Sequence, residues 1–106
     1  MDFEQLRESA QHASQLLKSL ANERRLLVLC HLSQGEKSVG ELERLVDLSQ
    51  SALSQHLGRL RRDNLVETRR EAQTIYYRVS SPEALAVLET LYGIFCGIAA
   101  TADSAD

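Results

Sequence analysis

Residues 38–62, SVGELERLVDLSQSALSQHLGRLRR, predict two short helices joined by a tight turn. Ser38 and Glu41 have the spacing of a capping box, in which each side chain accepts a hydrogen bond from the other residue's backbone N–H. The first helix is therefore expected to begin here. Ser49 is a suitable cap for the second helix, which continues to the end of the stretch.

The second of these helices has an apolar face formed by Leu53, Leu57 and Leu60, and its other positions are mostly polar. Two helices in this relation form a helix-turn-helix, in which side chains near the start of the second helix contact base edges in the major groove of DNA. Short or planar hydrogen-bonding groups suit that role. The candidates here are Gln50, Ser51, Ser54 and Gln55.

Later positions of the same helix are expected to contact the DNA backbone. Arg59 and Arg62 are candidates for holding phosphates and setting the register of the helix on the duplex. His56 lies beside the leucine face, so we expect it to pack there or to bond a phosphate rather than to recognise a base.

After the second helix the periodicity changes to one that is typical of strands. Residues 65–69 and 74–79 are rich in β-branched and aromatic side chains and predict a two-stranded hairpin. The connection at 70–73 has no Gly or Asn, so its turn signal is weak. Arg69 and Arg70 are expected near the tip, within reach of the DNA backbone or the adjacent minor groove.

Three further helices complete the prediction. Residues 3–20 have apolar side chains at intervals of three and four, Asn22 can cap a helix that Gly35 ends, and Ser81-Pro82 opens a last helix. The expected fold is mainly α with a small β-hairpin, a winged helix-turn-helix of order ααααββα.

The length of the chain limits it to one small domain. Its 106 residues predict a single DNA-binding and dimerisation domain over residues 1–98, followed by a frayed tail over 99–106. A chain of this size buries only about 60–70% of its unfolded surface, so a dimer is a natural way to enlarge the core. The start of the chain has neither a basic region nor an apolar secretory core, and every apolar run is too short to cross a membrane, so a cytoplasmic location is expected.

The net charge of −3 hides an uneven distribution of charge. Residues 48–79 carry six arginines against three carboxylates, a net charge of +3, whereas the segments on either side are acidic. Arg is suited to phosphate and guanine contacts. The basic segment coincides with the predicted second helix and hairpin, so double-stranded DNA is the expected partner.

Several of these runs resemble the ArsR/SmtB family of winged-helix repressors. The matching runs are Ala21–Leu26 (ANERRL), Ser38–Leu42 (SVGEL), Leu48–Leu57 (LSQSALSQHL) and Ile75–Val79 (IYYRV). The resemblance extends over about residues 3–98. It implies a homodimer that pairs through its first and last helices and represses operators with imperfect inverted repeats.

The metal sites known in that family do not match this chain. The arsenic and cadmium type has a Cys-x-Cys directly after Glu41-Leu42, where this chain has Glu43-Arg44-Leu45. The positions that correspond to the ligands of the zinc type are Ser81, Glu83, Ile94 and Gly97, which include a single carboxylate. We therefore expect neither a metal nor another cofactor.

The two cysteines, Cys30 and Cys96, are too few for a disulfide scaffold. Free cysteines are often simply buried as small apolar groups. Their placement in the second and last helices, however, resembles the dithiol branch of the family that senses reactive sulfur, the SqrR/BigR/HlyU type. That resemblance implies a small persulfide or polysulfide inducer, which cross-links the two thiols and so releases the operator.

Three other interpretations stay open at this point. The first is a metal-responsive repressor with Cys30 or Cys96 among its ligands, and the second is a constitutive repressor with inert cysteines. The third is a small redox enzyme, which the sequence does not favour because it has no His-Glu-x-x-His, nucleophile elbow or Cys-x-x-Cys. Gly35 and Gly40 have the spacing of a phosphate loop, but Glu41-Leu42 replaces the Lys and Ser/Thr that such a loop needs.

Overall fold

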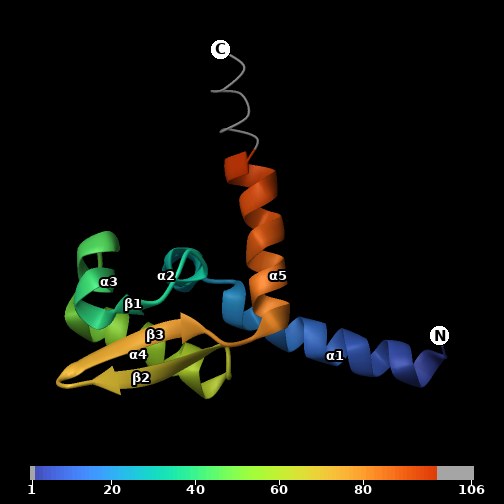
Figure 1. The fold of residues 1–106 in the computed structure, drawn as a ribbon. Coiled ribbons are helices and arrows are strands. Elements are labelled where there is room, and N and C mark those ends of the chain that lie inside the picture. Colours follow the sequence, from blue (N-terminus) through green and yellow to red (C-terminus); the bar gives the residue numbers. More distant parts are fainter. Residues whose placement is uncertain (1, 98–106) are drawn as a thin grey trace, which may run out of the picture.

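A computed structural model describes residues 2–97 of the chain (Figure 1). In order, its elements are α1 (Phe3–Leu20), α2 (Glu23–Ser33), β1 (Lys37–Ser38), α3 (Val39–Leu45), α4 (Gln50–Arg62), β2 (Val66–Glu71), β3 (Thr74–Val79), α5 (Pro82–Leu91) and the π-helical turn η1 (Tyr92–Gly97). The predicted winged helix-turn-helix is confirmed, with α3 and α4 as the helix pair and β2 and β3 as the wing. The predicted tail over 99–106 lies outside the described residues.

Side-chain caps start the helices where the sequence predicts them. Asn22 accepts hydrogen bonds from the first backbone N–H groups of α2, and Ser81 accepts one at the start of α5. At α3 both halves of the capping box are present, because the Glu41 carboxylate accepts from the Ser38 backbone and the Ser38 hydroxyl accepts from the Glu41 backbone. These caps set the beginning of each helix independently of tertiary contacts.

One apolar core joins the helix-turn-helix to the rest of the molecule. On α4, Leu53, Leu57 and Leu60 are buried, and they share the core with residues of α2, α3, β2 and α5. Each fully buried leucine contributes about 1.5–3 kcal/mol through removal of its side chain from water. The remaining buried apolar members are Leu20, Val28, Leu29, Leu32, Leu42, Val46, Leu65, Val66, Ala84 and Leu88.

The sheet has one more strand than the predicted hairpin. The short strand β1 pairs antiparallel with β3, with Lys37 opposite Tyr77 and Ser38 opposite Tyr76, which gives the order β1-β3-β2. The wing itself closes through a two-residue turn between Glu71 and Thr74. Ala72, the first residue of this turn, has a φ of 57°. The common two-residue hairpin turns require a positive φ at this position, which Gly or Asn adopts more readily than Ala.

The end of α4 is shaped by a Schellman motif. The Leu65 N–H donates to the Leu60 carbonyl at 3.0 Å, and the Asn64 N–H donates to the Arg61 carbonyl at 3.1 Å. Asn64 has a φ of 61°, which turns the chain out of the helix and directly into β2. This motif fixes the wing close to the C-terminal end of α4.

Two helices leave the body of the molecule as separate arms (Figure 1). Only the C-terminal part of α1 reaches the core, where Ser19 and Leu20 are buried and Leu16 packs against the other apolar residues, and η1 continues α5 outward from the sheet. The radius of gyration of 15.7 Å exceeds the value of about 13 Å for a compact chain of this length. The two arms therefore account for the open shape of the subunit.

A polar network ties the end of α1 to the end of α4. The buried Ser19 hydroxyl donates to the Asp63 carboxylate at 2.6 Å, and Arg59 donates to the same carboxylate oxygen at 2.8 Å. The hydrogen bond from Ser19 and then the pairing with Arg59 lower the pKa of Asp63 below its usual value. This network fixes the C-terminal part of α4 against α1.

Replacing Ser19 by Ala is expected to lower the free energy of unfolding at neutral pH by about 1–2 kcal/mol, since it removes a buried hydrogen bond to a charged group. A carboxyl group with a lowered pKa stabilises the fold above its unfolded pKa of about 3.9 and loses that effect as the pH falls through its folded pKa. The deficit of Ser19→Ala should therefore shrink in acid. Urea denaturation at equal protein concentration measures it, with the exposed Ser14→Ala as control. A deficit that is equal at neutral and acid pH would assign the effect to the other bond of Ser19, to the Gln15 carbonyl.

Candidate DNA-binding surface and thiol pair

The first half of α4 presents the polar side chains that were predicted to contact bases. Ser49 caps the helix, and its hydroxyl accepts a hydrogen bond from the Ala52 N–H at 3.2 Å. Because Leu53, Leu57 and Leu60 anchor the opposite side of the helix in the core, the polar side is held toward solvent. The predicted base-contacting residues are all exposed: Gln50, Ser51, Ser54 and Gln55.

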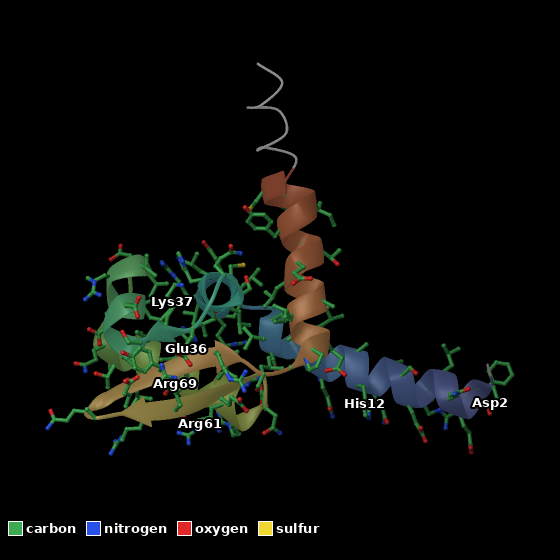
Figure 2. The ribbon with its side chains drawn as sticks, in the orientation of Figure 1. Asp2, His12, Glu36, Lys37, Arg61 and Arg69 are labelled. Atoms are coloured by element: carbon green, nitrogen blue, oxygen red, sulfur yellow. The ribbon has the colours of Figure 1, made fainter. Side chains whose placement is uncertain are left out.

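Arg61 also belongs to this exposed face, although it is not among the residues that the sequence predicts for the site. At about 100° per residue, Arg61 lies about 20° from Gln50 around the helix axis, and Arg62 lies between Ser51 and Gln55. Both arginines are exposed, and Arg61 is labelled in Figure 2. Its angular position is the sequence signal that identifies it. The exposed face of α4 thus carries two arginines at its C-terminal end.

Arg59 and His56 lie at the border of this face. The Arg59 guanidinium is engaged by Asp63, so it is turned toward α1. His56 is half-buried, and burial followed by the nearby charges of Arg25 and Arg24 lowers its pKa. The imidazole is therefore protonated less readily than that of an ordinary histidine, which makes it a weaker partner for a phosphate. The contacts of Arg59 and His56 with phosphate stay predictions.

The two arginines of the wing differ in their surroundings. Arg69 donates to the carboxylates of Glu36 and Glu71 and lies over the ring of Tyr76. Arg70 is exposed close to the tip, and within residues 2–97 it makes no ion pair. The sequence alone does not predict this difference between Arg69 and Arg70.

The two cysteines are 66 positions apart in the sequence, and the fold places them on α2 and on η1, the continuation of the α5 helix that packs against α2. Cys30 is half-buried on α2, Cys96 is exposed on η1, and both are free thiols. Burial raises the pKa of Cys30, and the charge of the neighbouring Cys96 thiolate raises it further. The α2 helix contacts α5, and α5 in turn contacts η1, which carries Cys96. Cys30 therefore ionises less readily than an ordinary thiol, and Cys96 is the more accessible of the two.

Comparison with known proteins identifies the family of the chain. A family model described as "Bacterial regulatory protein, arsR family" matches residues 22–68. The chain is 52% identical to the transcriptional activator HlyU of Vibrio cholerae over 96 residues, which are 91% of this chain and 89% of that protein. It belongs to the ArsR family of regulators.

Two further relatives support the assignment to the ArsR family. The structure of reduced HlyU from Vibrio cholerae superposes with a TM-score of 0.85 at 52% identity, covering 89% of this chain and 99% of that one. The biofilm growth-associated repressor of Agrobacterium fabrum is 53% identical over 81 residues, which are 76% of this chain and 69% of that protein. This ArsR-family chain is thus a helix-turn-helix transcriptional regulator.

Within residues 2–97 of this ArsR-family protein, no three His, Cys, Asp or Glu side chains are grouped so that they could hold a metal ion. Of the positions that match the zinc ligands of the family, Ser81 is used as the cap of α5 and Glu83 lies in its first turn. Separately, none of the helices described over the same residues is both long and apolar enough to cross a membrane.

In the reduced ArsR-family protein at neutral pH, we expect iodoacetamide to alkylate Cys96 faster than Cys30 by about an order of magnitude, because the reactive form is the accessible thiolate. Labelling of Cys30 should continue to rise with pH above the ordinary thiol pKa of about 8.5. Peptide mass spectrometry over a time course measures both rates. The urea-unfolded protein is the control, in which the rates should converge. Faster labelling of Cys30 in the folded protein would contradict the assigned environments.

Proposed function

We propose that the chain is a repressor that binds an imperfect inverted repeat as a homodimer and releases it when reactive sulfur species cross-link Cys30 to Cys96. The observation that carries the proposal is the placement of one free thiol on α2 and the other on η1, which continues the α5 helix that packs against α2. The protein would act in the cytoplasm, where its operator lies, with a persulfide or polysulfide as its inducer and no cofactor.

The chemistry of the switch follows from the exposure of the thiols. The Cys96 thiolate attacks the terminal sulfur of a persulfide, a Cys–S–S bond forms, the S–S bond of the persulfide breaks, and a thiolate leaves. The Cys30 thiol then loses its proton and attacks the sulfur of Cys96, which expels hydrosulfide and leaves a disulfide. Both cysteine sulfurs are oxidised and the persulfide is reduced. If Cys96 carries two added sulfur atoms, attack of the Cys30 thiolate on the added sulfur that is bonded to Cys96 expels hydrosulfide and leaves a trisulfide bridge, which spans a wider gap.

The position of Cys30 explains how a bridge can reach the DNA-binding surface. Cys30 lies on α2, which contacts α1, α3, α4, α5 and β3. A bridge to η1 constrains α2 relative to α5. The α4 helix, the recognition helix of the proposed complex, packs on α2 through the shared core. A shift of α2 therefore changes the spacing between the two recognition helices of a dimer.

The proposed DNA contacts fall into two sets. Base edges are contacted by Gln50, Ser51, Ser54 and Gln55, and phosphates by Arg61, Arg62 and Arg70, all of which are exposed. Arg59 and His56 supplement the phosphate contacts at the border of the face. In a symmetric dimer the two half-sites lie about one helical turn apart.

The proposed dimer uses the exposed apolar side chains of the two arms. Those on α1 are Phe3, Leu6 and Leu17, and those on η1 are Tyr92, Ile94 and Phe95. Phe3 is 87% exposed and Phe95 is 71% exposed in the single subunit. Apolar surface of this extent on a subunit indicates an interface. Pairing through the first and last helices covers it.

Leu6→Glu is expected to shift the protein from dimer to monomer and to weaken DNA binding, since each half-site then has to be bound separately. Analytical ultracentrifugation measures the oligomeric state. Leu45→Glu on α3 is the matched control, because Leu45 is 46% exposed and Leu6 is 54% exposed. That variant should stay dimeric. A dimeric Leu6→Glu protein at the same concentration would contradict the proposed interface.

The sensing proposal is tested with a DNA duplex selected by the reduced, unaltered protein from a random-sequence library. Glutathione persulfide should cross-link Cys30 to Cys96 and abolish binding, and dithiothreitol should restore it. Intact mass should show the loss of two hydrogens for a disulfide, or whole sulfur atoms in addition for a polysulfide bridge. Cys30→Ser and Cys96→Ser should bind the duplex and keep it under persulfide.

Other results have distinct meanings. Release by zinc or cadmium without a change in mass would identify a metal-responsive regulator. Release from the serine variants as readily as from the parent would show that the thiols are inert. Failure of the reduced protein to select any duplex would contradict the DNA-binding proposal itself.

A further inference from the structure

Arg69 is the most extensively bonded side chain on the surface of the wing. Its Nε and Nη2 atoms donate to the Glu36 carboxylate at 2.9 and 2.7 Å, and its Nη1 atom donates to Glu71 at 2.9 Å. Its guanidinium carbon lies 4.4 Å from the centre of the Tyr76 ring. A single exposed ion pair contributes little to stability. An arginine that binds a carboxylate through two hydrogen bonds and belongs to a network of charges can fix the relative position of the groups that it joins.

The partners of Arg69 come from separate segments. Glu36 belongs to the connection between α2 and β1, whereas Glu71 and Tyr76 lie on the two strands of the wing. Figure 2 shows Glu36 and Arg69 close together where that connection passes the sheet. The contact therefore joins the wing to the end of α2, and the side chain spans a junction between two parts of the fold.

The register of the strands places the two neighbouring arginines on opposite faces of the sheet. Successive residues of a strand alternate between faces, so Arg70 shares a face with the buried Val66. Val66 packs in the core that also contains the leucines of α4. Arg70 thus extends from the side of the sheet that faces the recognition helix, whereas Arg69 points to the other side.

The charges around Arg69 are unfavourable for a DNA phosphate. On this face Arg69 and Arg78 are matched against three carboxylates, those of Glu36, Glu67 and Glu71. A phosphate that displaced Glu36 from Arg69 would meet two carboxylates within the same cluster. The arrangement of charge suits an internal contact and opposes a DNA contact.

We infer that Arg69 is a positioning residue, which holds the wing against the α2–β1 connection through Glu36 so that Arg70 is presented to the DNA backbone. The inference rests on the proposed DNA binding. It replaces the expectation that both wing arginines contact DNA with a division of roles between them. Glu36, an acidic residue, then supports the binding of a polyanion.

Glu36→Gln distinguishes the two roles of Arg69 by the sign of its effect. If Arg69 positions the wing, the substitution loosens the wing and weakens binding of the selected duplex by about 3- to 10-fold. If Arg69 contacts phosphate, the substitution frees a cation, removes a negative charge and strengthens binding. Glu67→Gln is the matched control, because it makes the same change of charge on the same face without touching Arg69.

The salt dependence of binding provides a second readout. Arg70→Ala should reduce the slope of log K against log salt by about 0.9, the value for one lost phosphate contact. Arg69→Ala should weaken binding at every salt concentration and leave the slope unchanged. Thermal unfolding of each variant confirms that it is folded.

Tighter binding by Glu36→Gln than by Glu67→Gln, or a slope reduced equally by Arg69→Ala and Arg70→Ala, would overturn the inference. Either result leaves the proposed function intact, because the protein still binds the duplex. Absence of binding by the unaltered protein would instead be a failure of the proposed function.

Discussion

Burial of one side of α4 is the constraint on which the rest of the structure depends. Leu53, Leu57 and Leu60 are held in a core built from α2, α3, β2 and α5, so α4 cannot rotate about its axis without exposing them. The same packing decides which polar side chains face solvent. The Schellman motif that follows Arg62 then directs the chain into the wing, so recognition helix and wing are positioned by one continuous piece of structure.

Most of the fold could be predicted because its determinants are local. Caps at Asn22, Ser38, Ser49 and Ser81 and the spacing of leucines act within a few residues of sequence. The strand β1 was not predicted, because two residues are too few to show an alternating pattern. It is a strand only through its pairing with Tyr76 and Tyr77.

The candidate site was predictable in its residue types and less so in their roles. Exposure of Gln50, Ser51, Ser54 and Gln55 follows from helical periodicity, and the same reasoning applied to Arg61 would have included it. The partners of Arg59 and Arg69 could not be found in this way. Asp63 is held by Ser19 from α1, and Glu36 lies 33 positions before Arg69. Such contacts arise from the tertiary fold, which sequence periodicity does not describe.

The central position of α2 has a thermodynamic consequence for the proposed switch. Because α2 contacts both the recognition helix and the helix that leads to Cys96, thiol chemistry and DNA binding act on one set of packed elements. Linkage is reciprocal: if a bridge between the cysteines weakens the operator complex by some factor, the operator opposes formation of the bridge by the same factor. Operator-bound protein would then be the form most resistant to oxidation. The number of binding sites in the cell would thus help to set the concentration of reactive sulfur at which the regulator responds.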